Sequence, residues 1–308
     1  MEKMRRMLWI SLMTVLIGVS MTVEVQPRQS QFKSPRPPLQ AEEWVKRSFA
    51  ALEQGQYEQA IYWAKRVQDK YGNVHVRWFP SWLKRIVSED TIPDPYDDEG
   101  ILQATIASFK HGRGLNWKFL VRSTSPAWLI ADAYFRKGEY EKALEIYEEM
   151  SKGIPPWIDA IAPSRAYLCR KFIAEGYRPP QPPPKTTWRP LPLKFREEDY
   201  FILVPLDEAC KILGLGCSIQ PNPKMAGGKG IRVTKPDAPN LVYRLFLGRP
   251  LVERLEGSRG QTETLAYAPY EENGVVWVPF YWLAKQAGIR GWEVREGKIY
   301  VAPKQGTK

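Results

Sequence analysis

Histidine and cysteine are scarce in this chain of 308 residues. His75 and His111 are the only histidines, and Cys169, Cys210 and Cys217 are the only cysteines. A transition-metal site needs several His, Cys or carboxylate ligands at suitable spacings, and no Cys-x-x-Cys pair is present. Three cysteines are also too few for a disulfide framework. The sequence predicts no metal and no cofactor, and it leaves open whether Cys210 and Cys217 pair or are separate buried side chains.

Motifs that carry catalysis are missing as well. The segment Gly257-Ser258-Arg259-Gly260 lacks the spacing of a nucleophile elbow. The segment Gly227-Gly228-Lys229-Gly230 resembles a phosphate-binding loop in part, but no Ser or Thr follows the lysine and a strand is expected next. Both segments are interpreted as loops. The sequence therefore predicts a protein that is not an enzyme and has no catalytic residues.

Carboxylates cluster most densely just before residue 100. The cluster consists of Asp94, Asp97, Asp98 and Glu99. Such groups bind hard cations, of which Ca²⁺ is the common example. They also precede an apolar pattern that includes Leu102 and Ile106, and acids are favoured at the start of a helix by its dipole. We interpret the cluster as helix capping, with calcium binding as the alternative.

The positive charge of the chain, +11 overall, is unevenly distributed. Residues 1–40 carry six Lys/Arg and two acids, and residues 178–194 carry four Lys/Arg and no acids, so each segment has a net charge of +4. Residues 41–177 carry nineteen of each sign, and residues 195–308 carry sixteen and thirteen, or +3. A nucleic-acid-binding protein concentrates its cations on a folded face. We therefore expect no nucleic-acid partner.

The N-terminus has the pattern of an export signal. Lys3, Arg5 and Arg6 precede an almost wholly apolar run, so residues 1–23 are predicted to be a signal peptide or, if uncleaved, a membrane anchor. Residues 24–40 are rich in Pro, Gln, Ser and Arg and are expected to be a disordered spacer. The rest of the chain is expected outside the cytoplasm, in the cell envelope or secreted, with the membrane touched only through an uncleaved N-terminal segment.

Residues 41–177 carry the spacing of helical hairpins. Small or apolar side chains recur at three- and four-residue steps over 41–71 and 126–150, on either side of a Gly-x-Tyr turn that contains Tyr57 or Tyr140. Further helices are expected near 80–88, 98–110 and 157–176.

Both hairpins resemble tetratricopeptide repeats, which place Gly-x-Tyr at the turn and an alanine, here Ala60 or Ala143, in the second helix. These alanines lie further apart than two repeat periods, so residues 72–125 are interpreted as an insertion. The resemblance implies a concave groove that binds a protein or peptide partner. Its groove residues would be Glu42, Phe49, Trp128, Asp132 and Phe135.

A proline-rich linker and a repeated unit follow. Residues 178–194 contain the run Pro179-Pro180-Gln181-Pro182-Pro183-Pro184 and are predicted to be a stiff spacer between two independent cores. After it, Val204-Pro205 opens a helical pattern that ends at Gly214, and Val278-Pro279 opens another that ends at Gly288. A β-rich run follows each of them. The repetition indicates architecture and predicts strand–helix–strand units in an α+β domain.

Residues 195–304 resemble the copper amine oxidase N-terminal-like domain of exported bacterial proteins. The resemblance rests on Asn273-Gly274-Val275-Val276-Trp277-Val278-Pro279 and on the terminal segments Trp292-Glu293-Val294 and Gly297-Lys298-Ile299-Tyr300-Val301. The catalytic domain of the oxidases has a His-x-His copper site, and this motif is missing here. The resemblance therefore implies an accessory module, with a twisted antiparallel sheet packed on helices.

Tryptophan is abundant, with 12 residues. Arg77-Trp78-Phe79 and Trp82 interleave rings with cations, and Trp277, Trp282 and Trp292 lie near the second Val-Pro unit. We interpret these rings mainly as core packing, although an exposed ring would provide a platform for a glycan. The whole sequence predicts an α+β fold in an exported, non-enzymatic scaffold or adaptor of the bacterial cell envelope, which binds a protein partner. The alternative is a module that binds wall polysaccharide.

Overall fold

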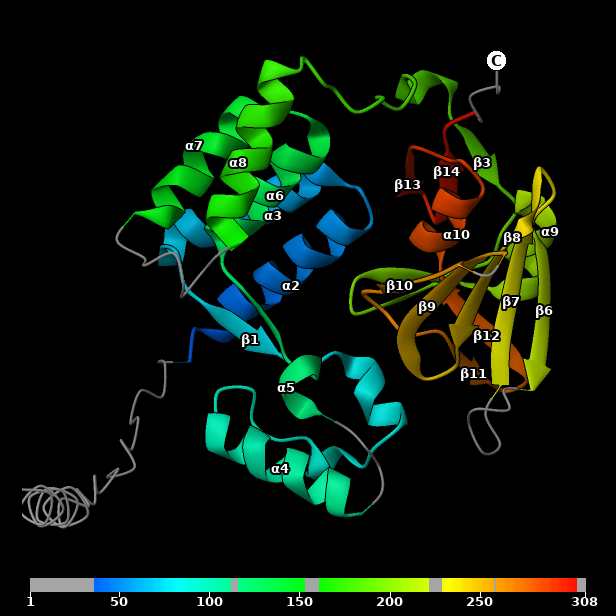
Figure 1. The fold of residues 1–308 in the computed structure, drawn as a ribbon, viewed down its shortest axis with the longest axis horizontal. Coiled ribbons are helices and arrows are strands. Elements are labelled where there is room, and N and C mark those ends of the chain that lie inside the picture. Colours follow the sequence, from blue (N-terminus) through cyan, green and yellow to red (C-terminus); the bar gives the residue numbers. More distant parts are fainter. Residues whose placement is uncertain (1–35, 112–115, 153–160, 222–228, 258, 304–308) are drawn as a thin grey trace, which may run out of the picture. The chain divides into compact units, whose positions relative to one another are not determined.

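The computed structural model describes residues 36–111, 116–152, 161–221, 229–257 and 259–303. Helices dominate before residue 177 and antiparallel strands after residue 188, so the predicted α+β fold class is confirmed (Figure 1). The predicted signal peptide and most of the predicted spacer lie outside the described residues, as do Gly227, Gly228 and Ser258 of the two segments predicted to be loops. The loop prediction is wrong for Lys229-Gly230 and Arg259-Gly260, because each pair begins a strand that is hydrogen-bonded to a neighbouring strand. None of the helices in the described ranges is long and apolar enough to cross a membrane.

Two helical hairpins and a fifth helix build the N-terminal region. They are α2 (Leu39–Glu53), α3 (Tyr57–Tyr71), α6 (Pro126–Lys137), α7 (Tyr140–Ser151) and α8 (Ile161–Ala174). Each hairpin occupies the predicted range, and α2 begins two residues earlier than expected. Ala60 and Ala143 are fully buried between helices, and Ser48 donates a hydrogen bond of 2.7 Å to the carbonyl of Ala60. Small side chains therefore allow these helices to approach closely.

The insertion between the hairpins has a structure of its own. It begins with β1 (Val76–Trp78) and ends with β2 (Arg122–Thr124), which pair in an antiparallel ribbon. Between them lie the short 3₁₀ helices η1 (Ser81–Arg85) and η2 (Glu89–Thr91), and the α-helices α4 (Asp98–Lys110) and α5 (Trp117–Leu120). The helix expected near 80–88 is thus only a 3₁₀ turn. Trp82 and Leu83 of this turn are buried, whereas Lys84 pairs with Glu89 and Arg85 pairs with Glu198.

The acidic cluster caps α4. The Asp97 carboxylate accepts a hydrogen bond of 3.0 Å from the backbone N–H of Gly100, and Asp98 pairs with Arg77 at 2.7 Å. The capping interpretation is therefore confirmed for Asp97. Within the described ranges, no group of three or more His, Cys, Asp or Glu is arranged to hold a metal ion.

The C-terminal region contains three sheets and two helices. A five-stranded antiparallel sheet runs in the order β10-β9-β8-β7-β6, a four-stranded sheet in the order β11-β12-β5-β4, and a three-stranded sheet in the order β13-β14-β3. The bounds of the first sheet, in chain order, are β6 (Gly216–Pro221), β7 (Lys229–Lys235), β8 (Ala238–Phe246), β9 (Arg249–Glu256) and β10 (Arg259–Thr264). Those of the second are β4 (Arg196–Glu198), β5 (Phe201–Pro205), β11 (Tyr270–Glu272) and β12 (Val275–Pro279). Those of the third are β3 (Arg189–Leu191), β13 (Trp292–Arg295) and β14 (Lys298–Val301).

The two Val-Pro units are structural counterparts. In each, a strand passes directly into a helix: β5 into α9 (Leu206–Leu213) and β12 into α10 (Phe280–Gln286). The two strands pair with each other, with Val278 opposite Val204. The predicted repetition is therefore confirmed as a pair of strand–helix units. Cys210 of α9 and Cys217 of β6 form a disulfide, which answers the question that the sequence left open, and Cys169 is a free, buried thiol.

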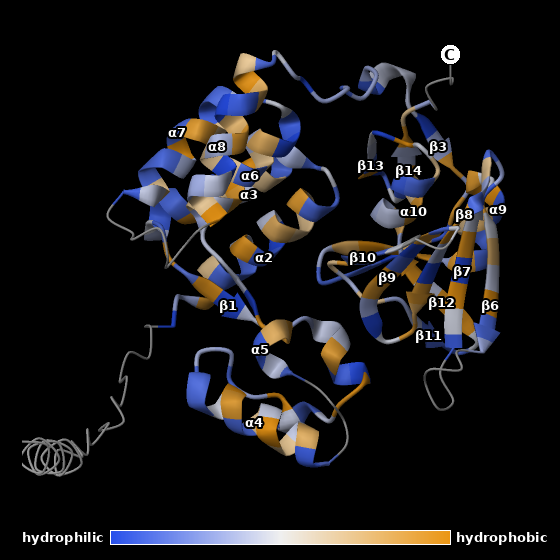
Figure 2. Ribbon diagram, viewed as in Figure 1, coloured by the Kyte–Doolittle hydropathy of each residue, from blue (hydrophilic) through white to orange (hydrophobic). Residues whose placement is uncertain are grey.

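The expectation of two independent cores is wrong. One hydrophobic cluster combines Trp82, Leu83 and Trp117 of the insertion with Phe201 and Tyr267 of the C-terminal region. Aromatic side chains bury large areas, and the ring of Phe201 lies 5.6 Å from that of Tyr267. The orange positions in Figure 2 follow the apolar faces of the helices and strands that contribute to the cores. The boundaries of the predicted domains, 41–177 and 195–304, remain predictions.

The proline-rich linker is held at both ends. A Cβ atom on Gly138 would lie 2.3 Å from Pro179, and one on Gly291 would lie 2.7 Å from Trp188, so chain and linker are in close contact at both glycines. The end of the linker also forms β3, which pairs with β14. The linker is therefore packed against the folded regions that precede and follow it. A free spacer would not make these contacts.

Candidate functional site

A tight turn of the C-terminal region rests on the end of α2. Between β4 and β5, Asp199 and Tyr200 have φ values of +47° and +66°, as a two-residue hairpin turn requires. The amide of Gln54, which is buried, holds this turn: its nitrogen donates to the carbonyl of Tyr200 at 2.8 Å, and its oxygen accepts from the N–H of Ile202 at 3.1 Å. Gln54 therefore fixes the turn next to α2.

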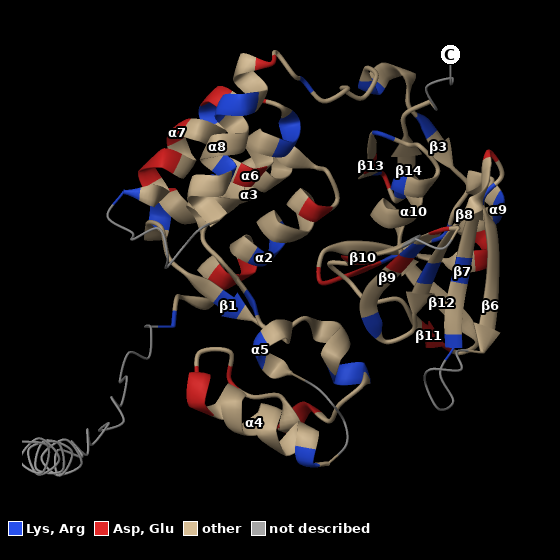
Figure 3. Cartoon of the chain, viewed as in Figure 1, with Lys and Arg blue, Asp and Glu red and all other residues tan. Residues whose placement is uncertain are grey.

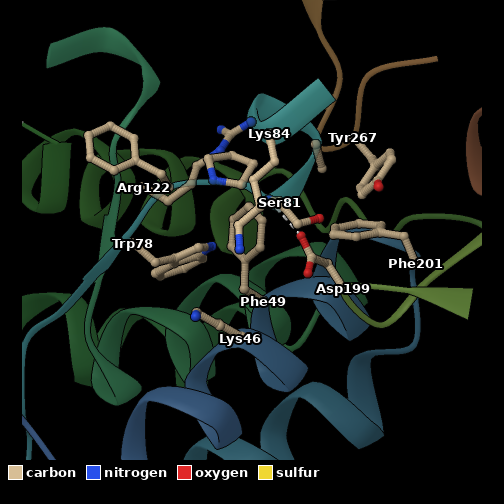
Figure 4. Close-up of a pocket in the computed structure, with 12 residues that line it drawn as sticks. Lys46, Phe49, Trp78, Ser81, Lys84, Arg122, Asp199, Phe201 and Tyr267 are labelled. Carbon is tan, nitrogen blue, oxygen red and sulfur yellow. Dashed lines mark hydrogen bonds between the residues drawn. The ribbon is translucent and has the colours of Figure 1, made fainter. Parts of the chain in front are cut away.

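A cavity of about 220 Å³ lies beside this turn. Its wall is formed by α2, the ribbon β1–β2, η1 with the two residues before it, the turn before β5 with the first residue of β5, and the segment after β10. The residues that line it are Lys46, Phe49, Trp78, Phe79, Pro80, Ser81, Lys84, Arg122, Asp199, Phe201, Ala266 and Tyr267. Figure 4 shows Phe49, Trp78 and Arg122 on one side and Asp199, Phe201 and Tyr267 on the other. Aromatic rings and charged groups therefore share one small space.

The rings pack edge to face around Phe49. Its centroid lies 5.4 Å from that of Trp78 and 6.5 Å from that of Phe201, with interplanar angles of 76° and 74°. These contacts restrict the rotamers of the rings and give the cavity rigid walls.

Arg122 is the unusual charge in this wall. Its guanidinium lies 5.7 Å from the ring centroid of Phe49 and donates one hydrogen bond of 3.3 Å to the carbonyl of Leu265. No carboxylate of the described ranges pairs with it. Burial lowers the pKa of Arg122, and the negative charge of Glu53 opposes this effect only in part. Glu53 itself pairs with Arg136 at 2.8 Å. A guanidinium in this position has donors to spare for an anion.

The other charged residues of the cavity have partners. Lys46 pairs with Glu42 at 2.6 Å, and Lys84 pairs with Glu89 at 2.5 Å. Asp199 accepts a hydrogen bond of 2.8 Å from the backbone N–H of Ser81, drawn as the dashed line in Figure 4. Arg122 is thus the cation that a ligand would neutralise.

A network of charged and phenolic groups supports Tyr267 from behind. The carboxylate of Glu198 accepts hydrogen bonds of 2.6 Å from both Arg85 and Tyr267, and it also contacts Tyr270 and Arg196. Burial and the bond to Glu198 raise the pKa of Tyr267 well above its usual value. The phenol therefore remains neutral and fixed at physiological pH.

Two of the predicted groove residues come from α2, and only one lines the cavity. Phe49 is part of the wall, whereas Glu42 lies behind it as the partner of Lys46.

The three predicted groove residues of α6 face its helical neighbours. Trp128 packs edge to face on Tyr147 at 5.5 Å, and the ring of Phe135 lies 5.9 Å from that of Phe172 in α8. Asp132 is buried and pairs with Arg136 at 2.9 Å. Trp128 and Phe135 therefore pack against one hydrophobic cluster that does not contain Phe49, and Asp132 accepts a hydrogen bond of 3.4 Å from Tyr147 of that cluster. The role of these three residues in partner binding remains a prediction.

Sequence reasoning missed most of the cavity. Arg122, Asp199 and Tyr267 are far apart in the chain, and none belongs to a recognisable motif. Tyr267 and Arg122 carry no local signal at all, whereas Asp199 follows two glutamates in a polar stretch that indicates only a turn. Among the described tryptophans, all are buried or half-buried, whereas the rings of Tyr62, Tyr167 and Tyr177 are exposed. Glycan binding through exposed Trp or Tyr therefore remains a prediction.

Comparisons with known proteins give no relative: no protein-family model, no curated protein and no solved structure matches this chain. The resemblances to tetratricopeptide repeats and to the copper amine oxidase N-terminal-like domain therefore remain predictions.

Proposed function

We propose that this chain is a non-catalytic adaptor of the bacterial cell envelope that binds a protein partner, and that the cavity beside Arg122 anchors an acidic segment of that partner. The observation that carries the proposal is the half-buried guanidinium of Arg122, which has no carboxylate partner in the described ranges and lies among aromatic rings. Burying an unpaired charge costs free energy, and an anionic ligand would recover that cost.

The size of the cavity supports a peptide anchor over a free cofactor. Sites for small molecules usually enclose about 300–1,000 Å³. The cavity of about 220 Å³ is smaller and accommodates one or two side chains. We therefore expect a carboxylate with an adjacent aromatic or aliphatic side chain, so that the acid meets Arg122 and the apolar group meets Phe49 and Trp78.

Two further observations support the remaining parts of the proposal. The disulfide between Cys210 and Cys217 suits an oxidising compartment, as expected for an exported protein. Asp199, the carboxylate of the cavity wall, accepts a hydrogen bond from the backbone N–H of Ser81 and does not pair with Arg122, so it leaves the guanidinium available to a carboxylate of the partner.

A matched pair of peptides tests the proposal. Calorimetric titration of the full chain with a capped Gly-Glu-Phe-Gly peptide is expected to show binding at least about tenfold tighter than with the Gly-Gln-Phe-Gly counterpart, equivalent to about 1.4 kcal/mol. Quenching of Trp78 should accompany binding, because its ring lines the cavity.

Arg122→Gln should remove the preference for the acidic peptide. Arg66→Gln is the control with the same change of charge, because Arg66 is exposed on α3 and lies over Trp44, away from the cavity. The thermal midpoint of Arg122→Gln should fall by at most about 4 °C, because the lost guanidinium has no carboxylate partner and only one hydrogen bond, to the carbonyl of Leu265. Equal affinity for the two peptides, or an Arg122→Gln variant that still prefers the acidic one, would refute the proposal.

A further inference from the structure

The insertion presents an apolar helix face to solvent. Leu102, Ile106 and Phe109 are spaced i, i+4 and i+7 on α4 and are 51%, 39% and 58% exposed. Phe119 of the adjoining α5 is 82% exposed. Residues at this spacing lie on one side of a helix. Ile101 and Ser108 occupy the opposite, buried side, so α4 packs against the protein through one face and exposes an apolar face through the other.

Unpaired cations lie next to the two exposed rings. Lys110 follows Phe109, and Lys118 precedes Phe119; both lysines are exposed, and neither forms an ion pair with any residue that the structure describes. Figure 3 shows the basic C-terminal end of α4, opposite its acidic N-terminal end. The acids at that other end are engaged: Asp97 caps the helix, and Asp98 pairs with Arg77. The exposed apolar face is thus bordered by free positive charge at its aromatic end.

We infer that the exposed face of α4 with Leu102, Ile106 and Phe109, together with Phe119 of α5 and the lysines Lys110 and Lys118, docks on the surface of a membrane that contains anionic lipid. Aromatic and aliphatic side chains on one helix face enter the boundary between headgroups and acyl chains, and neighbouring lysines attract anionic headgroups. This membrane contact does not involve the cavity. It would be a second contact, in addition to the one expected of an uncleaved N-terminal segment.

Charge argues for lipid over a second copy of the chain. In a symmetric dimer the same patch meets itself, so Lys110 and Lys118 would approach the same lysines of the partner copy. Like charges brought together at an interface are unfavourable. An anionic lipid surface complements both the rings and the lysines.

A fluorescent label at a single position tests the inference. Cys169 is buried and the other two cysteines form a disulfide, so a cysteine introduced as Phe119→Cys is the accessible thiol in the described ranges. We expect the emission of an environment-sensitive label at this position to shift to the blue when vesicles with about 30% phosphatidylglycerol are added. Vesicles of phosphatidylcholine alone should cause no shift.

The lysines should determine the affinity. The double variant Lys110→Gln/Lys118→Gln, measured with the same label, should need roughly 20-fold more anionic lipid for half of the shift, because each lysine near such a surface contributes about fivefold. Salt at high concentration should have a similar effect.

Tyr62→Cys provides the matched control, because Tyr62 is an exposed ring on α3, away from α4. Its label should not respond to lipid, although the same N-terminal segment is present. No shift at position 119 with anionic vesicles would overturn the inference. An equal shift at position 62 would also overturn it, as would a shift without lipid that grows with protein concentration, which would indicate self-association.

Discussion

Gln54 has a structural role that its residue type alone does not suggest. A glutamine at the end of a helix is normally solvated. Here the side-chain amide accepts from the backbone N–H of Ile202 and donates to the backbone carbonyl of Tyr200, so it makes the hydrogen bonds that a neighbouring strand would make. A third hydrogen bond, of 3.1 Å, runs from its nitrogen to the carbonyl of Ala50. Every polar atom of the buried amide is therefore satisfied.

Replacing Gln54 by alanine is expected to lower the free energy of unfolding by about 2–4 kcal/mol, because a backbone donor and an acceptor would be buried without partners. Urea denaturation followed by circular dichroism measures the change. Gln59→Ala, at an exposed position of α3, is the control and should stay within about 0.5 kcal/mol of the parent. A Gln54→Ala variant as stable as the control would show that the turn does not depend on the amide.

At the scale of elements, the linker between α8 and β3 is defined by two close contacts. Gly138 ends α6 in the left-handed conformation, with φ of +85°, and Pro179 of the linker packs directly on it. Glycine is needed here for two reasons, since the backbone conformation disfavours a side chain and the proline occupies the space that one would fill.

The variant Gly138→Ala separates these reasons when it is compared with Gly176→Ala. Gly176 also has a positive φ, of +62°, but nothing lies within 4 Å of its added Cβ. We expect Gly176→Ala to cost about 1 kcal/mol of stability and Gly138→Ala at least about 1 kcal/mol more, measured by thermal or urea unfolding. Equal costs would contradict the packing of the linker on α6.

For the whole molecule, the oxidation state and accessibility of the three cysteines test the fold and the expectation that the chain is located in an oxidising compartment. Cys169 is buried between helices, and burial raises its pKa to about 11. At pH 8 only about one thiol in a thousand is then ionised, and the thiolate is the reactive form. The disulfide removes the other two cysteines from reaction.

An aromatic disulfide reagent at pH 8 should therefore find no reactive thiol in the native chain, one after denaturation, and three after denaturation with reduction. Because the pKa of Cys169 is higher in the folded than in the unfolded chain, its contribution to stability is complete below about pH 9 and is lost as the pH rises toward 11. Cys169→Ala should weaken this alkaline loss, recorded as the urea midpoint against pH. Three reactive thiols without reduction would contradict the oxidised structure.

Much of the local structure was predictable from particular residues. The small residues beside Gly-x-Tyr placed both hairpins, Asp97 marked the start of α4, and the two Val-Pro units marked the strands that enter α9 and α10. Each of these signals acts within a few residues, through side-chain spacing or a backbone hydrogen bond, so the sequence shows it directly. The three-residue strands β1, β2, β3, β4 and β11 were not predicted, because three residues carry too little pattern. The start of β10 was interpreted as a loop, since its Gly-rich sequence does not have the pattern of a strand.

The candidate site was not predictable in the same way. Phe49 was singled out as a groove residue, but its contacts with Phe201 and Arg122 join parts of the chain that no local signal connects. Whether Trp128, Asp132 and Phe135 faced solvent or a neighbouring helix likewise depended on the positions of α7 and α8.

The sequence by itself therefore determined the two helical hairpins, the cap of α4, the repeated strand–helix unit and the α+β class, because these follow from the spacing of side chains along a few turns or strands. Only the tertiary structure decided that the insertion and the C-terminal region share a core, that the linker is packed, and that Arg122 lies half-buried without a carboxylate in a small aromatic cavity. These features arise from contacts between residues distant in the chain, and the burial and charge balance of such contacts exist only once the chain has folded.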